Sequence, residues 1–525
     1  MSNGLTRREF VKGTVAGTAV LAFAGSPLFS TWAAEPVKRG GIWRYARNRT
    51  TPSLDAHRVS ETFTGIGAMY DYIVDVFIDP KTFEFKLVPG LATEWRTEKN
   101  DKRLILTLRK GVLFHDGSKF DAAVAKWNID RLRLHPKSFL ATDLKEIESV
   151  DVLNDQTIAI NLKYPSAGLI YTLSTARGQA GFVSKSFQEK NGDDELARKG
   201  CGTGAFRLKS WIVDEKVVLE RFPDYWKKGV DGKPLPYLDG MEEHYRPKID
   251  QAVLDLRSGG LDTVHFPPPR EVARIKESSD LLYLEMPPFE YQDVCCGFNP
   301  RKGPFTSLEL RRACCYAIDR ERFAKITGFG VSRPHQYPYI AQGQPGWSPK
   351  DWIDYTYNPQ KARDLVKAAY PKGVTVRVSV ISREPDTTYG ELLKAMWDAV
   401  GIKTELKATE RLEWINSMKK DDFEIGFWQG STNIGGFNRF RLASKEPGNW
   451  SNISVPQLDK ILDEHNETMS EAKRHDLMKN ALKIVYDQAL LTSAMALTHA
   501  VGTHKRVKGL RNNWRALMAN EVWMA

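Results

Sequence analysis

Val88-Pro-Gly-Leu-Ala-Thr-Glu-Trp95 is followed closely by Leu104-Ile-Leu-Thr-Leu-Arg-Lys-Gly-Val-Leu-Phe-His-Asp-Gly117. The apolar run at 104–108 predicts a buried strand, and the glycines at 111 and 117 favour turns. A helix is expected from about Ala122 to Leu134, directly after the second turn. A strand, a tight turn and a helix in this order are typical of an α/β unit.

The same alternation continues to the end of the chain. A capping-box pattern at Thr306-Ser-Leu-Glu309 predicts a helix through about Ile318. Strands are expected near 41–46, 157–162, 217–221, 374–381, 404–407, 423–428 and 494–501. Helices are expected near 63–77, 359–369, 389–400, 457–468 and 471–490. This spacing predicts sheets that are covered by helices on their faces.

Composition is that of a folded protein of 525 residues, with 42% hydrophobic and 11% aromatic residues. That length suits two or three domains. The formal net charge is +11, but the basic residues are scattered. Clusters such as Lys505-Arg506-Val507-Lys508 are short and lack the interleaved aromatic residues of a nucleic-acid face. No nucleic-acid partner is therefore expected.

The amino terminus has the features of an export signal. Thr6-Arg-Arg-Glu-Phe-Val-Lys12 is a full twin-arginine motif, and a weakly apolar stretch at 13–29 follows it. Thr31-Trp32-Ala33 offers a small-x-small cleavage site. The stretch is short and rich in glycine for a spanning helix, although an N-terminal membrane anchor is the alternative reading. We expect residues 1–33 to be a signal peptide and the mature protein to lie in the periplasm, exported after folding.

Five cysteines occur, at 201, 295, 296, 314 and 315. Their apolar surroundings and the absence of C-x-x-C spacing favour buried free thiols over a zinc or redox site. One disulfide between the 295/296 and 314/315 pairs is the alternative.

Motifs of the common enzyme classes are missing from the sequence. It has no G-x-S-x-G elbow, no H-E-x-x-H and no Walker loop, and Gly202-Thr-Gly204 is interpreted as a tight turn. The ten histidines are dispersed without metal-ligand spacing. We therefore expect no catalysis, no bound metal and no cofactor. The alternatives are a periplasmic cofactor-dependent enzyme and a metal or haem carrier.

A series of short blocks resembles the extracellular solute-binding proteins of family 5, the peptide- and nickel-type binding components of ABC importers. The blocks follow one another over nearly the whole mature chain. They are Val88–Trp95, Leu108–Gly117, Gly202–Phe206, Arg221–Trp226, Gly260–Asp262, Gly297–Pro300, Leu310–Arg320, Val400–Ile402 and Ser454–Asp459.

The resemblance implies a two-lobed α/β fold of the type II, cluster C-like periplasmic binding proteins, with the ligand cleft between the lobes. Lobe I would comprise residues 34–290 and the returning segment 499–525, and lobe II residues 291–498. The closed form would deliver a small organic solute, peptide-like or anionic, to an ABC permease in the membrane. A monomer is expected.

The resemblance also suggests where the ligand binds. In peptide-binding relatives, a loop that matches Trp428, Gln429, Ser431 and Asn433 contains an Asp that holds the amino terminus of the ligand. That position falls on Ser431 in this sequence. A hydroxyl cannot neutralise an ammonium group in a closed cleft, so ordinary peptides are a poor match.

Six further residues are candidate ligand contacts. Arg383 follows a predicted strand, where relatives that bind peptide carboxylates keep an Arg, and its planar fork suits a carboxylate or phosphate. A surface Arg paired with Glu384 or Asp386 is the alternative. The others are Trp450, which would stack on the ligand or pack in a core, and Arg47, Asn48, His265 and Phe266, which lie after strands that line the cleft in the family.

Changing Arg7 and Arg8 together to Lys should leave the precursor in the cytoplasm, because the twin-arginine pair is the address that the export receptor reads. Immunoblots of fractionated cells measure this. Mature protein in the periplasmic fraction of the double variant would contradict the assignment.

Overall fold

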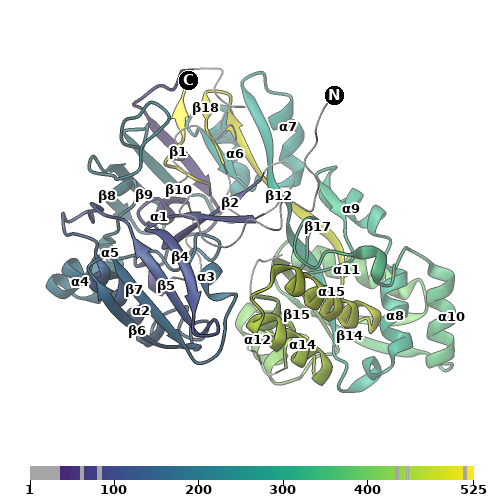
Figure 1. The fold of residues 1–525 in the computed structure, drawn as a ribbon. Helices are drawn as coiled ribbons and strands as arrows, with labels where there is room; N and C mark the ends of the chain where they lie inside the picture. Colours follow the sequence, from purple (N-terminus) through teal and green to yellow (C-terminus); the bar gives the residue numbers. More distant parts are fainter. Residues whose placement is uncertain are drawn as a thin grey trace, which may run out of the picture. The chain divides into compact units, whose positions relative to one another are not determined.

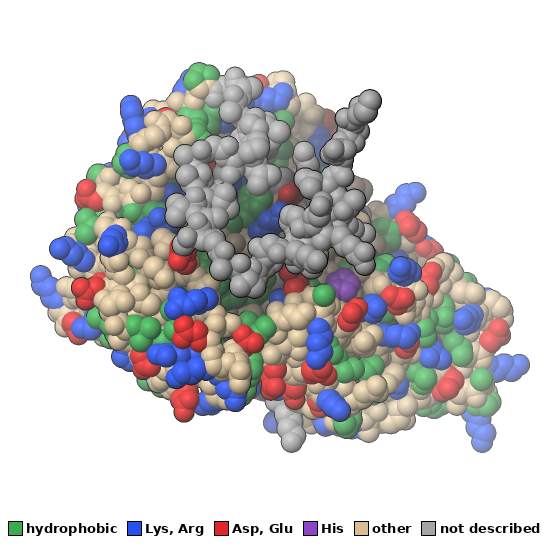
Figure 2. All heavy atoms as spheres, in the orientation of Figure 1, with side chains coloured by type: hydrophobic (Ala, Val, Ile, Leu, Met, Phe, Trp, Pro, Cys, Tyr) green, Lys and Arg blue, Asp and Glu red, His purple; other side chains and the backbone are tan. Residues whose placement is uncertain are grey.

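The structure is a computed structural model that describes residues 36–59, 64–79, 85–431, 437–444, 446, 448–511 and 517–525. The twin-arginine motif lies outside the described residues. Within the described residues, no helix is long and apolar enough to cross a membrane. Over the face visible in Figure 2, Lys and Arg side chains are interspersed with Asp and Glu.

One large mixed sheet contains most of the strands. In the described part of the chain it has eleven, and a short strand, β13 (Ser332–Pro334), pairs with β17 beside the main path. The order along that path is β15 (Ile402–Thr409), β14 (Val374–Ile381), β16 (Ile425–Ser431), β12 (Leu281–Phe298), β17 (Leu491–His504), β11 (Thr263–His265), β1 (Ile42–Arg47), β10 (Gly240–Tyr245), β9 (Lys216–Arg221) and β8 (Phe206–Ile212).

Two long antiparallel strands, β12 and β17, lie in the middle of this sheet (Figure 1). Their pairing runs from Leu281 opposite His504 to Gly297 opposite Leu491. The longest register shift lies between Glu285 and Glu290, and shorter ones follow before Gln292 and before Cys295. On one side of the shift β17 also pairs with β11, and on the other side it pairs with β13. The same two strands therefore connect both halves of the sheet.

The half of the sheet formed by β14, β15 and β16 is covered on both faces. Alternate residues of β12 and β16 point to opposite faces, so Cys296 and Phe427 join one core whereas Cys295 and Trp428 join the other. Helices α8 (Leu308–Ala317), α9 (Arg320–Gly328), α10 (Pro359–Ala369) and α11 (Asp386–Asp398) supply the first core. Helices α12 (Arg411–Lys419), α14 (Pro456–Glu467) and α15 (Glu471–Asp487) supply the second.

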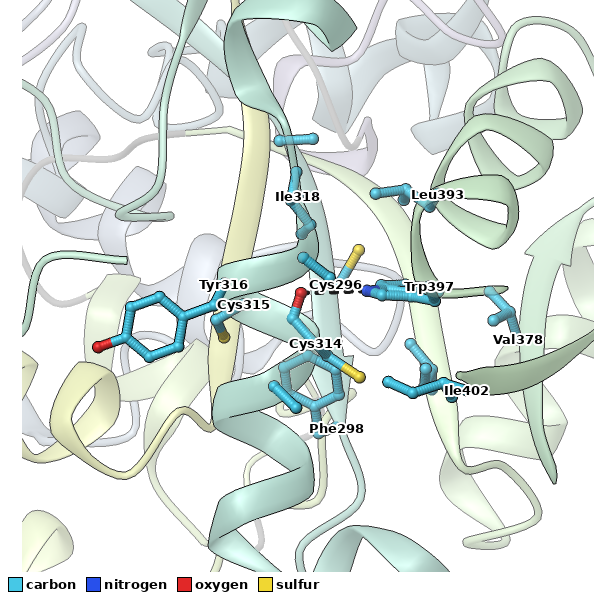
Figure 3. Packing of buried hydrophobic residues seen from close by; sticks show 14 of the residues in the cluster. Cys296, Phe298, Cys314, Cys315, Tyr316, Ile318, Val378, Leu393, Trp397 and Ile402 are labelled. Atoms are coloured by element: carbon cyan, nitrogen blue, oxygen red, sulfur yellow. Dashed lines mark hydrogen bonds between the residues drawn. The ribbon is translucent and has the colours of Figure 1, made fainter. Parts of the chain in front are cut away.

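The first of these cores contains three of the cysteines. Figure 3 shows Cys296, Cys314 and Cys315 among Phe298, Leu393 and Trp397, whose indole N–H donates to the carbonyl of Cys314 at 3.1 Å. All five cysteines are buried free thiols. Burial raises the pKa of Cys315 to about 11 and that of Cys201 to about 12, so both remain protonated and pack as small apolar groups.

The other half of the chain adds a second, four-stranded antiparallel sheet. Its order is β4 (Ala92–Glu98), β5 (Arg103–Leu108), β7 (Thr157–Leu162) and β6 (Ile147–Asn154). Helix α2 (Ala122–Leu134) contacts β6 and β7 and begins after Asp121, whose side chain accepts from Val124 N. The strand, turn and helix predicted from 104–134 are thus confirmed.

Shorter elements complete this half. They are helices α1 (Thr64–Gly67), α3 (Leu169–Thr172), α4 (Lys185–Asn191), α5 (Asp193–Lys199), α6 (Ile249–Arg257) and α7 (Val272–Lys276), and the two-stranded pairs β2 (Val74–Ile78) with β3 (Phe85–Pro89) and β18 (Val507–Lys508) with β19 (Trp523–Met524).

The helix expected over 63–77 is wrong for its second half. There the chain forms β2, and Val74, Val76 and Ile78 alternate as buried residues against β3. Strand pairing and the β preference of valine and isoleucine override the helix-like spacing. Residue 63 itself lies outside the described residues.

Gly202 and Gly204 lie in a close backbone crossing rather than in an isolated turn. Gly204 N donates to Met69 O at 3.0 Å, and Phe206 N donates to Ala68 O at 3.1 Å. A Cβ on Gly204 would lie 2.5 Å from Ala68 O and from Tyr70 N. Only glycine lets the two segments come this close.

Gly204→Ala should therefore destabilise the protein by about 1–3 kcal/mol, because backbone atoms must move to admit the methyl group. Gly67→Ala is the matched control, since an added Cβ there meets nothing within 4 Å. Thermal unfolding of both variants measures the effect. Equal unfolding midpoints would show that the crossing has room for a side chain.

Candidate functional site

Arg383, Gln429 and Ser431, three of the predicted ligand residues, lie at or just after the ends of two neighbouring strands. β14 runs parallel to β15 and to β16, so the carboxyl ends of β14 and β16 lie at the same edge of the sheet. Arg383 stands two residues after β14, and Gln429 lies near the end of β16. The structure thus brings together two residues that are 46 positions apart.

Asp386 links these two residues. From the sequence we expected it only as a surface partner of Arg383. Arg383 Nε donates to Asp386 Oδ2 at 2.6 Å, and Gln429 Nε2 donates to Asp386 Oδ1 at 2.6 Å. The Asp386 side chain is 1% exposed, whereas that of Arg383 is 45% exposed. The pairing left open by the sequence is therefore present, and it leaves the outer part of the guanidinium accessible.

Trp428 and Trp450 pack with Trp414 in a cluster of three indoles. Trp428 is buried, and its Nε1 donates to the hydroxyl of Tyr339 at 2.8 Å. Its ring lies 5.9 Å from Trp450 at 90° and 6.2 Å from Trp414. Edge-to-face packing of this kind stabilises a core. Trp428 thus belongs to a core in this structure.

Arg441 covers this cluster and carries no motif that would have revealed it. Its guanidinium carbon lies 4.2 Å from the centre of the Trp450 ring, which is a cation–π contact. Burial lowers the pKa of Arg441, and the guanidiniums of Arg177 and Arg411 lower it further. The residue stands on α13 (Phe437–Leu442), directly after the segment that contains Asn433.

Ser431 is the last residue of β16 and pairs with Gln292 of β12. Asn433 lies outside the described residues.

Arg47 is buried inside the protein at the end of β1. Its Nε donates to Glu243 at 2.6 Å and its Nη2 donates to Thr51 Oγ1 at 2.6 Å. Glu243 also accepts from Gly65 N at 2.7 Å. Arg47 thus ties three segments together, and the next residue, Asn48, is exposed.

His265 is buried against His499 of β17, and the half-buried Phe266 lies beside both. His265 Nε2 and His499 Nε2 are 2.6 Å apart, and His265 Nδ1 is 2.6 Å from the hydroxyl of Tyr45. The Phe266 ring stacks on both imidazoles. Burial holds the pKa of His499 at about 3 and lowers the pKa of His265, with further lowering from His499, Arg47 and Arg49. Both imidazoles are therefore neutral at physiological pH.

A polar cavity of about 320 Å³ lies between residues 142–177 and residues 439–467. Asp143, Arg177, Arg439 and Glu446 are among the lining residues, and Arg439 also pairs with Asp463 at 2.9 Å. Close to it, Ala167 N donates to Asn466 O at 3.0 Å. Among the described residues, no group of three or more His, Cys, Asp or Glu side chains is arranged to hold a metal ion.

The fold and the strand-end site define a two-lobed α/β binding protein. Solved structures agree: the chain matches HbpA2 from Haemophilus parasuis with a TM-score of 0.80 at 20% identity, covering 92% of this chain and 100% of that one. It matches DppA from Helicobacter pylori in complex with the peptide STSA with a TM-score of 0.76 at 23% identity, covering 93% and 98%.

The model of the family "Bacterial extracellular solute-binding proteins, family 5 Middle" matches residues 86–452, and the chain belongs to this family. The dipeptide-binding protein of Escherichia coli (strain K12) is 25% identical over 471 residues, covering 81% of this chain and 85% of that one. The glutathione-binding protein GsiB of Pectobacterium atrosepticum is 28% identical over 431 residues, covering 77% and 79%. The chain is thus the substrate-binding component of an ABC importer, in a family of binding proteins rather than enzymes.

The buried histidines predict a dependence of stability on pH. An unfolded histidine has a pKa of about 6.5, so between that value and the folded pKa the unfolded chain binds more protons. The contribution of each buried histidine to the free energy of unfolding is therefore fully present well above pH 6.5 and is lost as the pH falls towards the folded pKa. One histidine that stays neutral accounts for about 2 kcal/mol between pH 7.5 and pH 5.

His499→Gln should lower stability at pH 7.5 but lose about 2 kcal/mol less than the wild type on going to pH 5. Urea unfolding at the two pH values measures both quantities. The exposed His475→Gln serves as control and should retain the wild-type difference. Equal pH dependence in His499→Gln and the wild type would contradict the burial argument.

Proposed function

We propose that this protein captures a small peptide-like solute that carries an anionic group and no free amine. One observation carries the proposal: the half-exposed Arg383, held at the end of β14 beside Gln429. A guanidinium in this position suits a carboxylate or phosphate, which it can hold with two parallel hydrogen bonds.

The end of β16 supports the second half of the proposal. Ser431 stands where the family resemblance leads one to expect the Asp that holds a peptide's amino group. A closed cleft without that carboxylate would leave an ammonium group desolvated and unpaired, at a cost of several kcal/mol. A blocked amine avoids this cost.

We further propose that the lobes, 34–290 with 499–525 and 291–498, close by bending of β12 and β17. The interrupted register between Glu285 and Glu290 supports a hinge there, since fewer ladder bonds resist bending. The same proposal includes export to the periplasm by the twin-arginine route and docking of the closed monomer on an ABC permease. It also includes ligand contacts by four further residues, Trp450, Asn48, His265 and Phe266.

Thermal-shift measurements with N-acetyl-Ala-Ala, free Ala-Ala and N-acetyl-Ala-Ala amide test the ligand class. The acetylated free acid should raise the unfolding temperature most, because it alone has the anion and lacks the amine. At 100 times its dissociation constant a ligand stabilises by about 2.7 kcal/mol. Free Ala-Ala stabilising as strongly as the acetylated acid would contradict the proposal.

Arg383→Ala should weaken binding of the acetylated acid by about 2–5 kcal/mol, since the anion loses its partner in the cleft. Arg383→Lys should also weaken it, because an ammonium group cannot reproduce the two-pronged geometry.

A further inference from the structure

Asp386 is a buried carboxylate at the first position of α11, and its two oxygens serve two different segments. Oδ2 accepts from Arg383 in the segment after β14, and Oδ1 accepts from Gln429 on β16. The helix that follows packs on the same face of the sheet: Tyr389 of α11 contacts Phe427 of β16 with ring centres 6.4 Å apart. Asp386 and Gln429 thus extend a row of contacts that begins in the core.

An ionised carboxylate can only accept hydrogen bonds, and this fixes the orientation of the Gln429 amide. The NH₂ group must face Asp386, so the carbonyl oxygen Oε1 faces away from it. An amide side chain in place of Asp386 would not impose this orientation, because it offers both a donor and an acceptor.

The guanidinium of Arg383 is fixed in the same way. Its Nε is occupied by Asp386, which leaves the edge with the two Nη groups on the outer side. Within the described residues, these Nη groups have no protein acceptor and Gln429 Oε1 has no protein donor. Gln429 is partly exposed.

We propose that Asp386 is a positioning residue that presents Arg383 and Gln429 as a matched pair, with the Nη edge for an anionic group and Oε1 for an N–H donor beside that anion. This inference rests on the proposed function and narrows its ligand class. The C-terminal end of an acylated amino acid or peptide has this pattern, a carboxylate with an amide N–H one carbon away.

Isothermal titration with three probes tests the pair. N-acetyl-Ala-Ala has both groups, N-acetylalanyl-lactic acid replaces the last N–H with an ester oxygen, and N-acetyl-Ala-Ala amide lacks the carboxylate. The wild type should bind the first about tenfold more tightly than the ester, because the ester leaves Oε1 without a donor. It should bind the amide at least about 30-fold more weakly than N-acetyl-Ala-Ala.

The variants separate the roles. Gln429→Leu should abolish the preference over the ester and keep the preference over the amide. Asp386→Asn should reduce the preference over the ester to about threefold or less, since the freed Gln429 amide can rotate. Glu391→Gln, an exposed carboxylate on the same helix, is the matched control and should keep the wild-type ratios.

The ratio of affinities distinguishes positioning from a purely structural role. Reduced stability of α11 would lower the affinity for all three probes by the same factor and leave the ratios unchanged. Unchanged ratios in Asp386→Asn would overturn the role of Asp386. A wild type that prefers the acid over the amide but binds ester and N–H forms equally would overturn this inference and leave the proposed function intact. Absence of binding by all three probes would overturn both.

Discussion

The antiparallel pairing of β12 and β17 is the interaction on which the other parts of the large sheet depend. β16 pairs with β12 on one side, and β11 pairs with β17 on the other, so neither half of the sheet is complete without these two strands. β17 is buried over almost its whole length, as expected for a strand with neighbours and covering layers on both sides. Its backbone groups therefore find their partners within the sheet.

Buried charges attach the surrounding segments to this pair of strands. Arg320 is buried at the start of α9 and donates to Ser493 O and Thr492 Oγ1 of β17, both at 2.8 Å. It also donates to the carbonyl of Tyr355 at 2.8 Å. A buried cation is costly unless its donors are satisfied, and here backbone carbonyls and the Thr492 hydroxyl satisfy them. Removing any one of these segments would leave polar groups unpaired in the core.

The same requirement shapes the site. Trp428 and Trp450 pack with Trp414, because large rings gain most from burial against other rings. The polar groups Arg383 and Gln429 remain at the edge of the sheet, where one buried carboxylate holds them. A rigid sheet with polar groups at its strand ends can thus discriminate ligands without a catalytic apparatus.

The sequence by itself determined the α/β class and the positions of most helices and strands, because periodicity and turn glycines are local properties. The resemblance of its short sequence blocks indicated the family. α2 was predicted at its observed bounds, while α11 begins three residues before its predicted start. Only the tertiary structure decided that 74–78 is a strand, that Arg47 is buried against Glu243, and that Asp386 joins Arg383 to Gln429. Such contacts connect residues far apart in the chain, and no local pattern of residues encodes which of them meet.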